Sequence, residues 1–267
     1  MSFEKPRSRE WDASSYHRVS GPQTSWGAKV LARMDLRGDE TVLDAGCGTG
    51  RLTASLRDLL PRGRVIGLDL SENMLRQART HLLSDPGARV GFVCSDLVQL
   101  PFSKSIDVVF STASFHWVLD HRLLFRSIFG ALRPGGWLVA QCGGAANLQR
   151  FRAKIVQLSQ EAPFGSYLGK FEEPWLYSDS HTAAKNLSAA GFGEVETGIE
   201  AAPTRFKSAE QFSEFVRTAI VHKHLNLLPT DRLKRDFVQT LTAQAGSEEP
   251  ALELDYLRLN IRARKPA

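Results

Sequence analysis

The sequence predicts an α/β fold: a doubly wound, seven-stranded and mostly parallel sheet that carries helical cap insertions. Two observations predict it. Between residues 40 and 143, short apolar segments alternate with segments whose apolar residues recur at helical spacing. Glycine, proline or an acidic residue separates many of these elements from the next. Such alternation implies right-handed crossovers, a sheet covered on both faces, and ligands bound at the carboxyl ends of the strands.

The elements within residues 39–143 form the predicted ligand-binding core. Amphipathic helices are expected after the first, second and fourth apolar segments, because their apolar residues fall on one helical face. Ser71 is well suited to cap the second of these helices, since a serine hydroxyl accepts a hydrogen bond from the free N–H groups of a first turn. The expected strands are Thr41–Asp44, Val65–Leu68, Val90–Cys94, Ile106–Phe110 and Trp137–Gln141.

The segments outside the core follow weaker patterns. Phe164–Ser180, rich in aromatic residues, glycine and proline, is expected to be a loop. Tyr256–Arg264 alternates polar with apolar residues, which predicts a half-buried strand. The predicted parts are residues 1–38 as an N-terminal helical lid, 144–181 and 203–250 as a helical cap for the substrate, and 182–202 and 251–267 as the last helix and strands of the sheet.

The composition is that of an ordinary soluble globular protein: 267 residues, 42% hydrophobic, 24% charged, with a net charge of +5. The basic residues are scattered, so nucleic acid is not the expected partner. Three cysteines without metal-like spacing fit a reducing compartment. The polar Met1–Glu10 segment and the absence of an apolar run of ~20 residues predict a cytoplasmic protein with no membrane partner. Nothing in the sequence indicates an oligomeric state.

The first strand runs into a glycine-rich loop, Asp44-Ala45-Gly46-Cys47-Gly48-Thr49-Gly50, which precedes a helix. Glycines let the backbone turn sharply and approach a ligand closely. The helix after the loop presents free N–H groups and the positive end of its dipole, which suit a carboxylate or phosphate. The spacing is G-x-G-x-G, so neither the dinucleotide fingerprint nor the P-loop is matched.

Asp69 ends the second predicted strand, nineteen residues after Gly50. In doubly wound folds this position commonly carries an acceptor for ribose hydroxyls, and a carboxylate can accept from two vicinal hydroxyls at once. Asp96 follows the third predicted strand. It can serve as a ligand acceptor or form an Asx-type turn into Leu97.

Taken together, these segments resemble the Rossmann-like S-adenosylmethionine-dependent methyltransferases. The resemblance rests on VLDAGCGTG at Val42–Gly50, VIGLDLS at Val65–Ser71, Ser95–Leu97, and LRPGG at Leu132–Gly136. It implies a methyltransferase that binds S-adenosylmethionine and releases S-adenosylhomocysteine. It also implies cofactor contacts from the loop, from Asp69 to the ribose, from Met74 beside the adenine, and from Asp96 to the adenine amino group. The full cofactor-binding set that it implies is Asp44, Gly46, Cys47, Gly48, Gly50, Asp69, Leu70, Met74, Asp96 and Leu97.

Two substrate classes are disfavoured by the residues after the fourth strand. Nucleic-acid amino-methyltransferases carry [DNS]-P-P-[YFW] there to hold a flipped base, whereas this chain has Ser111–Ser114 without proline. Metal-dependent catechol enzymes need an acidic cluster, and none is evident. His222 and His224 are two residues apart on a predicted helix and point away from each other. No metal is therefore expected.

The flanking motifs resemble the group of carboxyl methyltransferases that includes the trans-aconitate, juvenile hormone acid and malonyl-carrier-protein enzymes. Tyr16 and Gln23 keep that group's Y-x₆-Q spacing, and His116-Trp117 keeps its H-W pair. The resemblance implies that Tyr16, Gln23 and Trp117 contact the substrate, with Gln23, Trp117 and His116 as the catalytic candidates. The expected substrate is a small molecule, most simply a carboxylic acid.

A carboxylate acceptor is already ionised at neutral pH and needs no general base, so two hydrogen-bond donors that orient it suffice. Three alternatives stay open. A phenol or amine acceptor would need a base, for which His116 or His17 is the candidate, and methylation at carbon is also possible on this scaffold. The chain can bind the cofactor without catalysis. Trp117 can be a core residue and His116 a helix cap.

Overall fold

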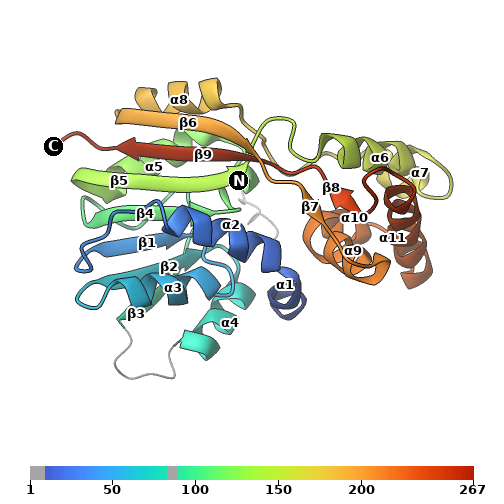
Figure 1. Cartoon of the computed structure of the whole chain (residues 1–267), viewed down its shortest axis with the longest axis horizontal. Helices are drawn as coiled ribbons and strands as arrows, with labels where there is room; N and C mark the ends of the chain where they lie inside the picture. Colours follow the sequence, from blue (N-terminus) through green and yellow to red (C-terminus); the bar gives the residue numbers. More distant parts are fainter. Residues whose placement is uncertain (1–9, 83–88) are drawn as a thin grey trace, which may run out of the picture.

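A computed structural model describes residues 10–82 and 89–267 and contains the expected sheet (Figure 1). The first nine residues of the predicted lid lie outside the described residues. The strand order is β3-β2-β1-β4-β5-β9-β6, and β9 alone runs in the direction opposite to the other six strands. The seven-stranded, mostly parallel α/β prediction is therefore confirmed. The strands are β1 Thr41–Ala45, β2 Arg64–Asp69, β3 Val90–Cys94, β4 Ile106–Thr112, β5 Leu132–Gly143, β6 Gly193–Ala201 and β9 Leu257–Arg264.

Helices cover both faces of this sheet because successive side chains of a strand point to opposite sides. In β1, Val42 belongs to the apolar cluster that contains residues of α2 and α3, whereas Leu43 belongs to the cluster that contains residues of α5 and α8. Both residues are fully buried. The helices of this part are α1 Ala13–Val19, α2 Gly21–Leu31, α3 Arg51–Leu59, α4 Glu72–Leu82, α5 His121–Ala131 and α8 Ser180–Ala189.

Local signals in the sequence account for several helix boundaries. Ser71 caps α4 as expected, since its hydroxyl accepts a hydrogen bond from the Met74 N–H at 3.3 Å. Asp120 caps α5 by accepting from the N–H groups of Arg122 and Leu123. No described helix is long and apolar enough to span a membrane.

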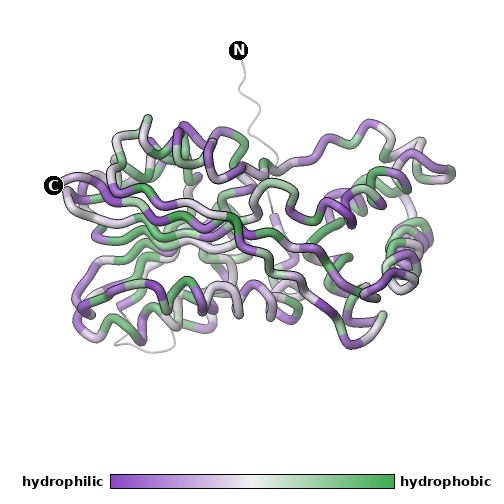
Figure 2. Tube along the Cα trace, turned by 45° about the horizontal axis from the view of Figure 1, so that its top comes forward, coloured by the Kyte–Doolittle hydropathy of each residue, from purple (hydrophilic) through white to green (hydrophobic). Residues whose placement is uncertain are grey.

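A second lobe lies beyond the carboxyl ends of the parallel strands (Figure 1). It has its own apolar core, in which Phe212, Phe215 and Phe237 are fully buried. Apolar residues recur along its helices as they do along the sheet (Figure 2). Its elements are α6 Gln149–Gln160, α7 Gly165–Leu168, β7 Thr204–Arg205, α9 Ala209–Phe215, the π-helix Val216–Ile220, α10 His222–Leu225, α11 Asp231–Gly246 and β8 Glu253–Leu254.

Two expectations differ from the structure. The segment predicted as a loop from Phe164 to Ser180 contains the short helix α7. The last strand is not half-buried along its whole length, because Arg258, on the side predicted to be polar and exposed, is only 2% exposed. Arg258 is covered because the first residues of β9 follow directly from β8 of the second lobe and because its guanidinium lies over the Trp26 ring of α2.

Candidate functional site

The glycine-rich loop is held in a conformation that requires its glycines. Gly46, Gly48 and Gly50 all have positive φ angles, of +82°, +54° and +82°. The main-chain N–H groups of Gly46 and Cys47 both donate to the Leu68 carbonyl at 2.7 and 2.9 Å. A Cβ atom at Gly46 would lie 2.0 Å from the Ser114 hydroxyl oxygen. The loop is thus fixed between the end of β2 and the turn after β4.

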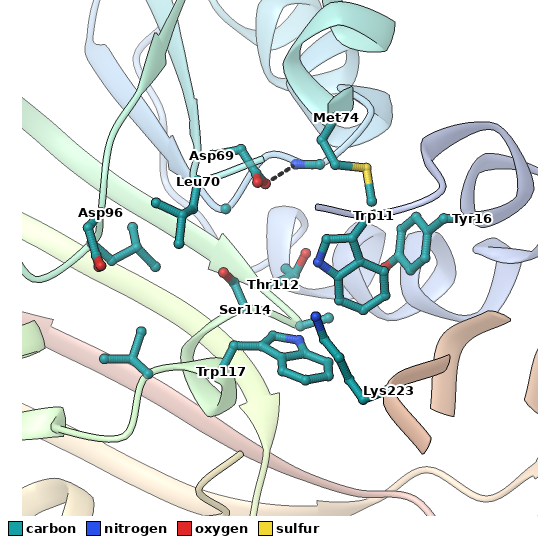
Figure 3. Close-up of a pocket in the computed structure, with 15 residues that line it drawn as sticks. Trp11, Tyr16, Asp69, Leu70, Met74, Asp96, Thr112, Ser114, Trp117 and Lys223 are labelled. Carbon is teal, nitrogen blue, oxygen red and sulfur yellow. Dashed lines mark hydrogen bonds between the residues drawn. The ribbon is translucent and has the colours of Figure 1, made fainter. Parts of the chain in front are cut away.

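A cavity opens beside this loop, and we call it the loop cavity (Figure 3). It lies at the carboxyl ends of β1, β2 and β4, where the sequence predicted a ligand. The second-lobe helix α10 contributes Lys223, and the segment before α1 contributes Trp11. The predicted site residues that line it are Tyr16, Gly46, Gly48, Asp69, Leu70, Met74, Asp96, Leu97 and Trp117.

Asp69 links the wall of the loop cavity to the glycine loop. One carboxylate oxygen accepts from the Gly48 N–H and the other from the Ser71 N–H, each at 2.9 Å. Burial raises the pKa of Asp69, and the nearby Glu10 carboxylate raises it as well, while these backbone hydrogen bonds lower it. Each oxygen keeps a lone pair for a further donor.

Three residues predicted to bind the cofactor lie outside the lining of the loop cavity. Asp44 is 2% exposed and accepts a hydrogen bond from the Thr53 hydroxyl at 2.6 Å, which joins β1 to α3. Burial raises the pKa of Asp44 to about 7. Cys47 is buried, and burial raises the pKa of its thiol. Gly50 precedes α3, and a Cβ atom there would lie 2.9 Å from Leu82.

Asp96 forms the Asx-type turn that the sequence left open. Its side chain accepts a hydrogen bond from the Val98 N–H at 3.1 Å. It also lines the loop cavity beside Leu97. The turn therefore orients Asp96 at the cavity wall, so the two interpretations are compatible.

A second cavity adjoins the loop cavity on the side of the second lobe, and we call it the arginine cavity. Trp11, Tyr16, Ala113 and Trp117 line both cavities, so the two meet at these residues. The predicted substrate residue Gln23 lines the arginine cavity, and its side-chain oxygen is buried without a hydrogen-bond partner. His116, Arg152, Trp175, Tyr177 and Arg258 also contribute.

Aromatic rings form the wall between the two cavities. Trp117 meets Trp11 edge-on, with ring centroids 5.3 Å apart and planes at 84°, and meets Trp175 at 5.7 Å and 88°. Tyr16 packs against Trp11 at 5.4 Å. Burial raises the pKa of Tyr16 to about 12, so its phenol is neutral at pH 7. Trp117 is thus a cavity-lining residue rather than a member of the buried core.

The two histidines that were candidates for a base lie in different environments. His116 is buried, and its Nδ1 accepts a hydrogen bond from the Gly143 N–H at 3.3 Å. Burial and the nearby Arg258 hold the pKa of His116 well below its usual value. His17 lines neither cavity, and instead its Nδ1 is 2.8 Å from the Thr49 hydroxyl. His116 is therefore a weak base, and His17 is outside the site.

Several cavity residues were missed from the sequence. Thr112 and Ser114 lie at the end of β4 and just beyond it and line the loop cavity, but they belong to no motif. Lys223 stands between two histidines on α10, which gave no signal of a cavity position. Arg258 was placed on the solvent side of its strand by the alternation pattern. Only the three-dimensional arrangement of the second lobe brings Lys223 and Arg258 to the site.

Comparisons with known proteins identify the family to which the chain is related. The model of a family described as a methyltransferase domain matches residues 43–140. A trans-aconitate 2-methyltransferase of Methylobacterium radiotolerans is 34% identical over 96% of this chain and 98% of its own length. Another, of Deinococcus radiodurans, is 31% identical over 72% of this chain and 69% of its own length.

The chain belongs to the methyltransferase family of these relatives. It is an S-adenosylmethionine-dependent methyltransferase, as the sequence predicted. The fold is also that of phosphoethanolamine N-methyltransferase 2 of Haemonchus contortus in complex with S-adenosylmethionine, with a TM-score of 0.64. That structure is 21% identical to this methyltransferase and aligns with 96% of this chain and 57% of its own.

The residues of the methyltransferase fit such a cofactor. At Gly48 a Cβ atom would meet nothing within 4 Å, so the backbone there is open to a ligand. Two acids, Asp69 and Asp96, and one base, Lys223, line the loop cavity, and this excess of acidic groups suits a cationic sulfonium compound. Among the described residues, no group of three or more histidine, cysteine, aspartate or glutamate residues is arranged to hold a metal ion.

Proposed function

We propose that this methyltransferase transfers a methyl group to a carboxylate oxygen of a small organic acid. The loop cavity would hold the cofactor and the arginine cavity the acid, with Trp11, Tyr16 and Trp117 at the junction where the methyl group passes. The trans-aconitate 2-methyltransferase of Methylobacterium radiotolerans, to which the chain is related over 96% of its length, supports this assignment.

The observation that carries the proposal is the charge of the arginine cavity. Two arginines, Arg152 and Arg258, line it, and no aspartate or glutamate is among its lining residues. Arg152 is paired with Glu173, so Arg258 supplies the unpaired positive charge. The remaining polar groups of the cavity come from asparagine, glutamine, tyrosine, tryptophan and histidine side chains. A neutral amine or phenol gains nothing from such a charge distribution, whereas a carboxylate does.

The proposed reaction needs no general base from the protein, which has only to bind and orient the two reactants. S-adenosylmethionine supplies an electrophilic methyl carbon: a carboxylate oxygen takes it, the carbon–sulfur bond breaks, and the electron pair stays on sulfur to give S-adenosylhomocysteine. Gln23 and Trp117 would orient the carboxylate through their side-chain N–H groups, which are hydrogen-bond donors. Holding two bound reactants in line supplies most of the acceleration such a reaction needs.

The same site is poorly built for acceptors that must lose a proton. His116 engages its Nδ1 with the Gly143 N–H, so the neutral ring carries its proton on Nε2 and is a donor there. Burial also lowers the pKa of His116. We propose that His116 donates to the substrate or shapes the cavity, and does not act as a base.

The cofactor contacts that we propose follow the lining of the loop cavity. Asp69 would accept from the ribose hydroxyls, and Gly46 and Gly48 would border the amino-acid end. Leu70, Met74, Asp96 and Leu97 would surround the adenine. Asp44, Cys47 and Gly50 would act through the position of the loop. The helices α1 and α2 would close the site as a lid.

The test is release of S-adenosylhomocysteine from the purified protein with a panel of acids, phenols and amines, with a thermal-shift titration of the cofactor run in parallel. We expect turnover with acids only and a product that alkaline hydrolysis returns to the acid. Turnover restricted to phenols or amines, with a rate that depends on a group titrating near pH 7, contradicts the proposal. Cofactor binding without turnover on any class favours a non-catalytic module.

A further inference from the structure

We propose that Arg258 is a receptor for a second carboxylate, so that the substrate is a di- or polycarboxylic acid of which one carboxylate is methylated and another is held by this guanidinium. The inference rests on the proposed carboxylate methylation and deepens it. It assigns the discrimination between polyacids and monoacids to one residue.

The first observation is an unpaired, buried charge. Arg258 is 2% exposed, and its Nε and Nη2 atoms are buried without a hydrogen-bond partner among the described residues. Burying a charge without a partner costs several kcal/mol, so such a group is retained when a ligand completes it. The sequence keeps an arginine here, inside the sheet, where an apolar residue would pack at no such cost.

The second observation is which atoms lack a partner. Nε and Nη2 form one edge of the planar guanidinium, and their N–H bonds are parallel. This edge binds both oxygens of a single carboxylate through two parallel hydrogen bonds, a geometry that lysine cannot provide. The unpaired atoms are therefore the pair that a carboxylate needs, rather than two donors on opposite sides.

The guanidinium is held in place by aromatic neighbours. It lies over the ring of Trp26, with its central carbon 4.6 Å from the ring centroid. Trp26 in turn meets the buried Tyr256 edge-on at 4.7 Å. Tyr16, Tyr177 and Tyr256 act electrostatically on Arg258. Their phenols are neutral at pH 7, since an ordinary tyrosine pKa is about 10 and burial raises the pKa of all three further. The charge therefore has an orientation but no anion.

The position of Arg258 favours a carboxylate other than the one that reacts. Arg258 lines the arginine cavity but not the loop cavity, whereas Trp117 and Tyr16 line both. A carboxylate whose two oxygens are bound by a guanidinium is a poor nucleophile, because the cation stabilises its negative charge. The reacting carboxylate would thus lie toward Trp117 while Arg258 anchors the rest of the molecule.

Arg152 does not compete for this role. The Nε–Nη2 edge of Arg152 is already bound to the Glu173 carboxylate, through Nε at 2.8 Å and through Nη2. Its guanidinium also lies over the Tyr177 ring. The charge of Arg152 is therefore balanced by Glu173, while Arg258 offers the free hydrogen-bonding edge.

The experiment measures binding and turnover separately. The probes are trans-aconitate, a tricarboxylate, and crotonate, a monocarboxylate with the same unsaturated unit. Binding is measured by calorimetry on the S-adenosylhomocysteine complex. The variants are Arg258→Gln, Arg258→Lys and the matched control Arg262→Gln. Arg262 lies on the same strand and stacks on Trp137, but its guanidinium is paired with Glu196 at 3.2 Å.

We expect Arg258→Gln to weaken trans-aconitate binding by at least a hundredfold, with partial recovery in Arg258→Lys and no more than a twofold change in Arg262→Gln. KM for trans-aconitate should rise far more than kcat falls, and KM for crotonate should rise much less than KM for trans-aconitate. S-adenosylhomocysteine affinity should stay within twofold. The Tm of the ligand-free Arg258→Gln variant should be equal to or higher than that of the wild type, because an unpaired buried charge has been removed.

Several results overturn the inference. Equal losses for trans-aconitate and crotonate, or a lowered Tm with weaker cofactor binding, make Arg258 structural. A selective loss of S-adenosylhomocysteine affinity assigns the guanidinium to the cofactor's own carboxylate. Turnover of acids that is unaffected by Arg258→Gln overturns the receptor and leaves the proposed function intact. Arg258-dependent binding of trans-aconitate without methylation of any acid upholds the receptor and overturns the proposed function.

Discussion

The carboxylate of Asp69 accepts a hydrogen bond from the main-chain N–H of Gly48 at 2.9 Å, which connects the end of β2 to the middle of the glycine loop. Two stretches of sequence twenty-one residues apart thereby form one wall of the loop cavity. The same carboxylate also holds the Ser71 N–H ahead of α4. Asp69 therefore shapes the cavity even before a ligand adds hydrogen bonds to it.

Replacing Asp69 with alanine should weaken S-adenosylmethionine binding by at least tenfold, about 1.4 kcal/mol. The variant loses the proposed ribose acceptor and the tie to Gly48. Isothermal titration measures the effect, with Asp35→Ala as the control because Asp35 is an exposed acid away from the cavity. Affinity equal to the wild type would remove Asp69 from the ribose site.

Gly46→Ala should both destabilise the protein and impair cofactor binding. The new Cβ atom would lie 2.0 Å from the Ser114 hydroxyl oxygen, and φ at this position is +82°. The left-handed conformation alone costs an alanine about 1–2 kcal/mol. Gly91→Ala in β3 is the matched control, since a Cβ atom there meets nothing within 4 Å. Urea unfolding should separate the two variants, and equal stabilities would show that the loop can relax around Ser114.

Gln23→Ala should lower kcat/KM for the acid substrate by about 10- to 100-fold, which corresponds to about 1.4–2.7 kcal/mol of transition-state stabilisation. Cofactor affinity should remain nearly unchanged, because Gln23 lines the arginine cavity and not the loop cavity. Steady-state kinetics and a cofactor titration test both statements. The control is Gln149→Ala, which removes an exposed side-chain amide at the start of α6 and should leave kcat/KM unchanged. A parallel fall in cofactor affinity would make Gln23 a structural residue.

The stability of the protein should fall as the pH drops below about 6.5, in part through His224. This residue is buried against Phe171, with ring centroids 3.8 Å apart, and burial lowers its pKa from 6.5 to about 4. The unfolded chain therefore takes up a proton at His224 near pH 6.5, whereas the folded protein does so only near pH 4. Between pH 6.5 and pH 4, the free energy of unfolding therefore decreases by up to about 1.4 kcal/mol per pH unit because of His224.

Urea unfolding of the wild type and His224→Leu at pH 7.5, 6 and 5 measures this contribution. As the pH falls, the unfolding free energy of the wild type should decrease more than that of the variant. His181→Leu, on the exposed side of α8, should run parallel to the wild type. Parallel curves for His224→Leu and the wild type would mean that His224 titrates in the folded protein as it does in the unfolded chain.

The core of the fold could be predicted from the sequence because the signals that specify it lie within short segments. Apolar runs and helical stripes specify which face of each element is buried, as in β1, where Val42 and Leu43 enter opposite cores. The glycines at positive φ, the Ser71 cap and the acid at the end of β2 are likewise properties of a few neighbouring residues. These signals were enough to predict the sheet, the methyltransferase and its cofactor.

Tertiary structure alone decided which residues line the arginine cavity. Gln23 and Arg258 are 235 residues apart in the sequence, and they line one cavity because β9 enters the middle of the sheet from the second lobe. The alternation of polar and apolar residues along a strand shows only that its two faces differ in polarity. It does not tell whether solvent or another lobe covers the polar face, so the burial of Arg258 had no signature in its own neighbourhood. The physical reason is that burial depends on packing between segments distant in sequence, whereas periodicity records only each segment's own preference.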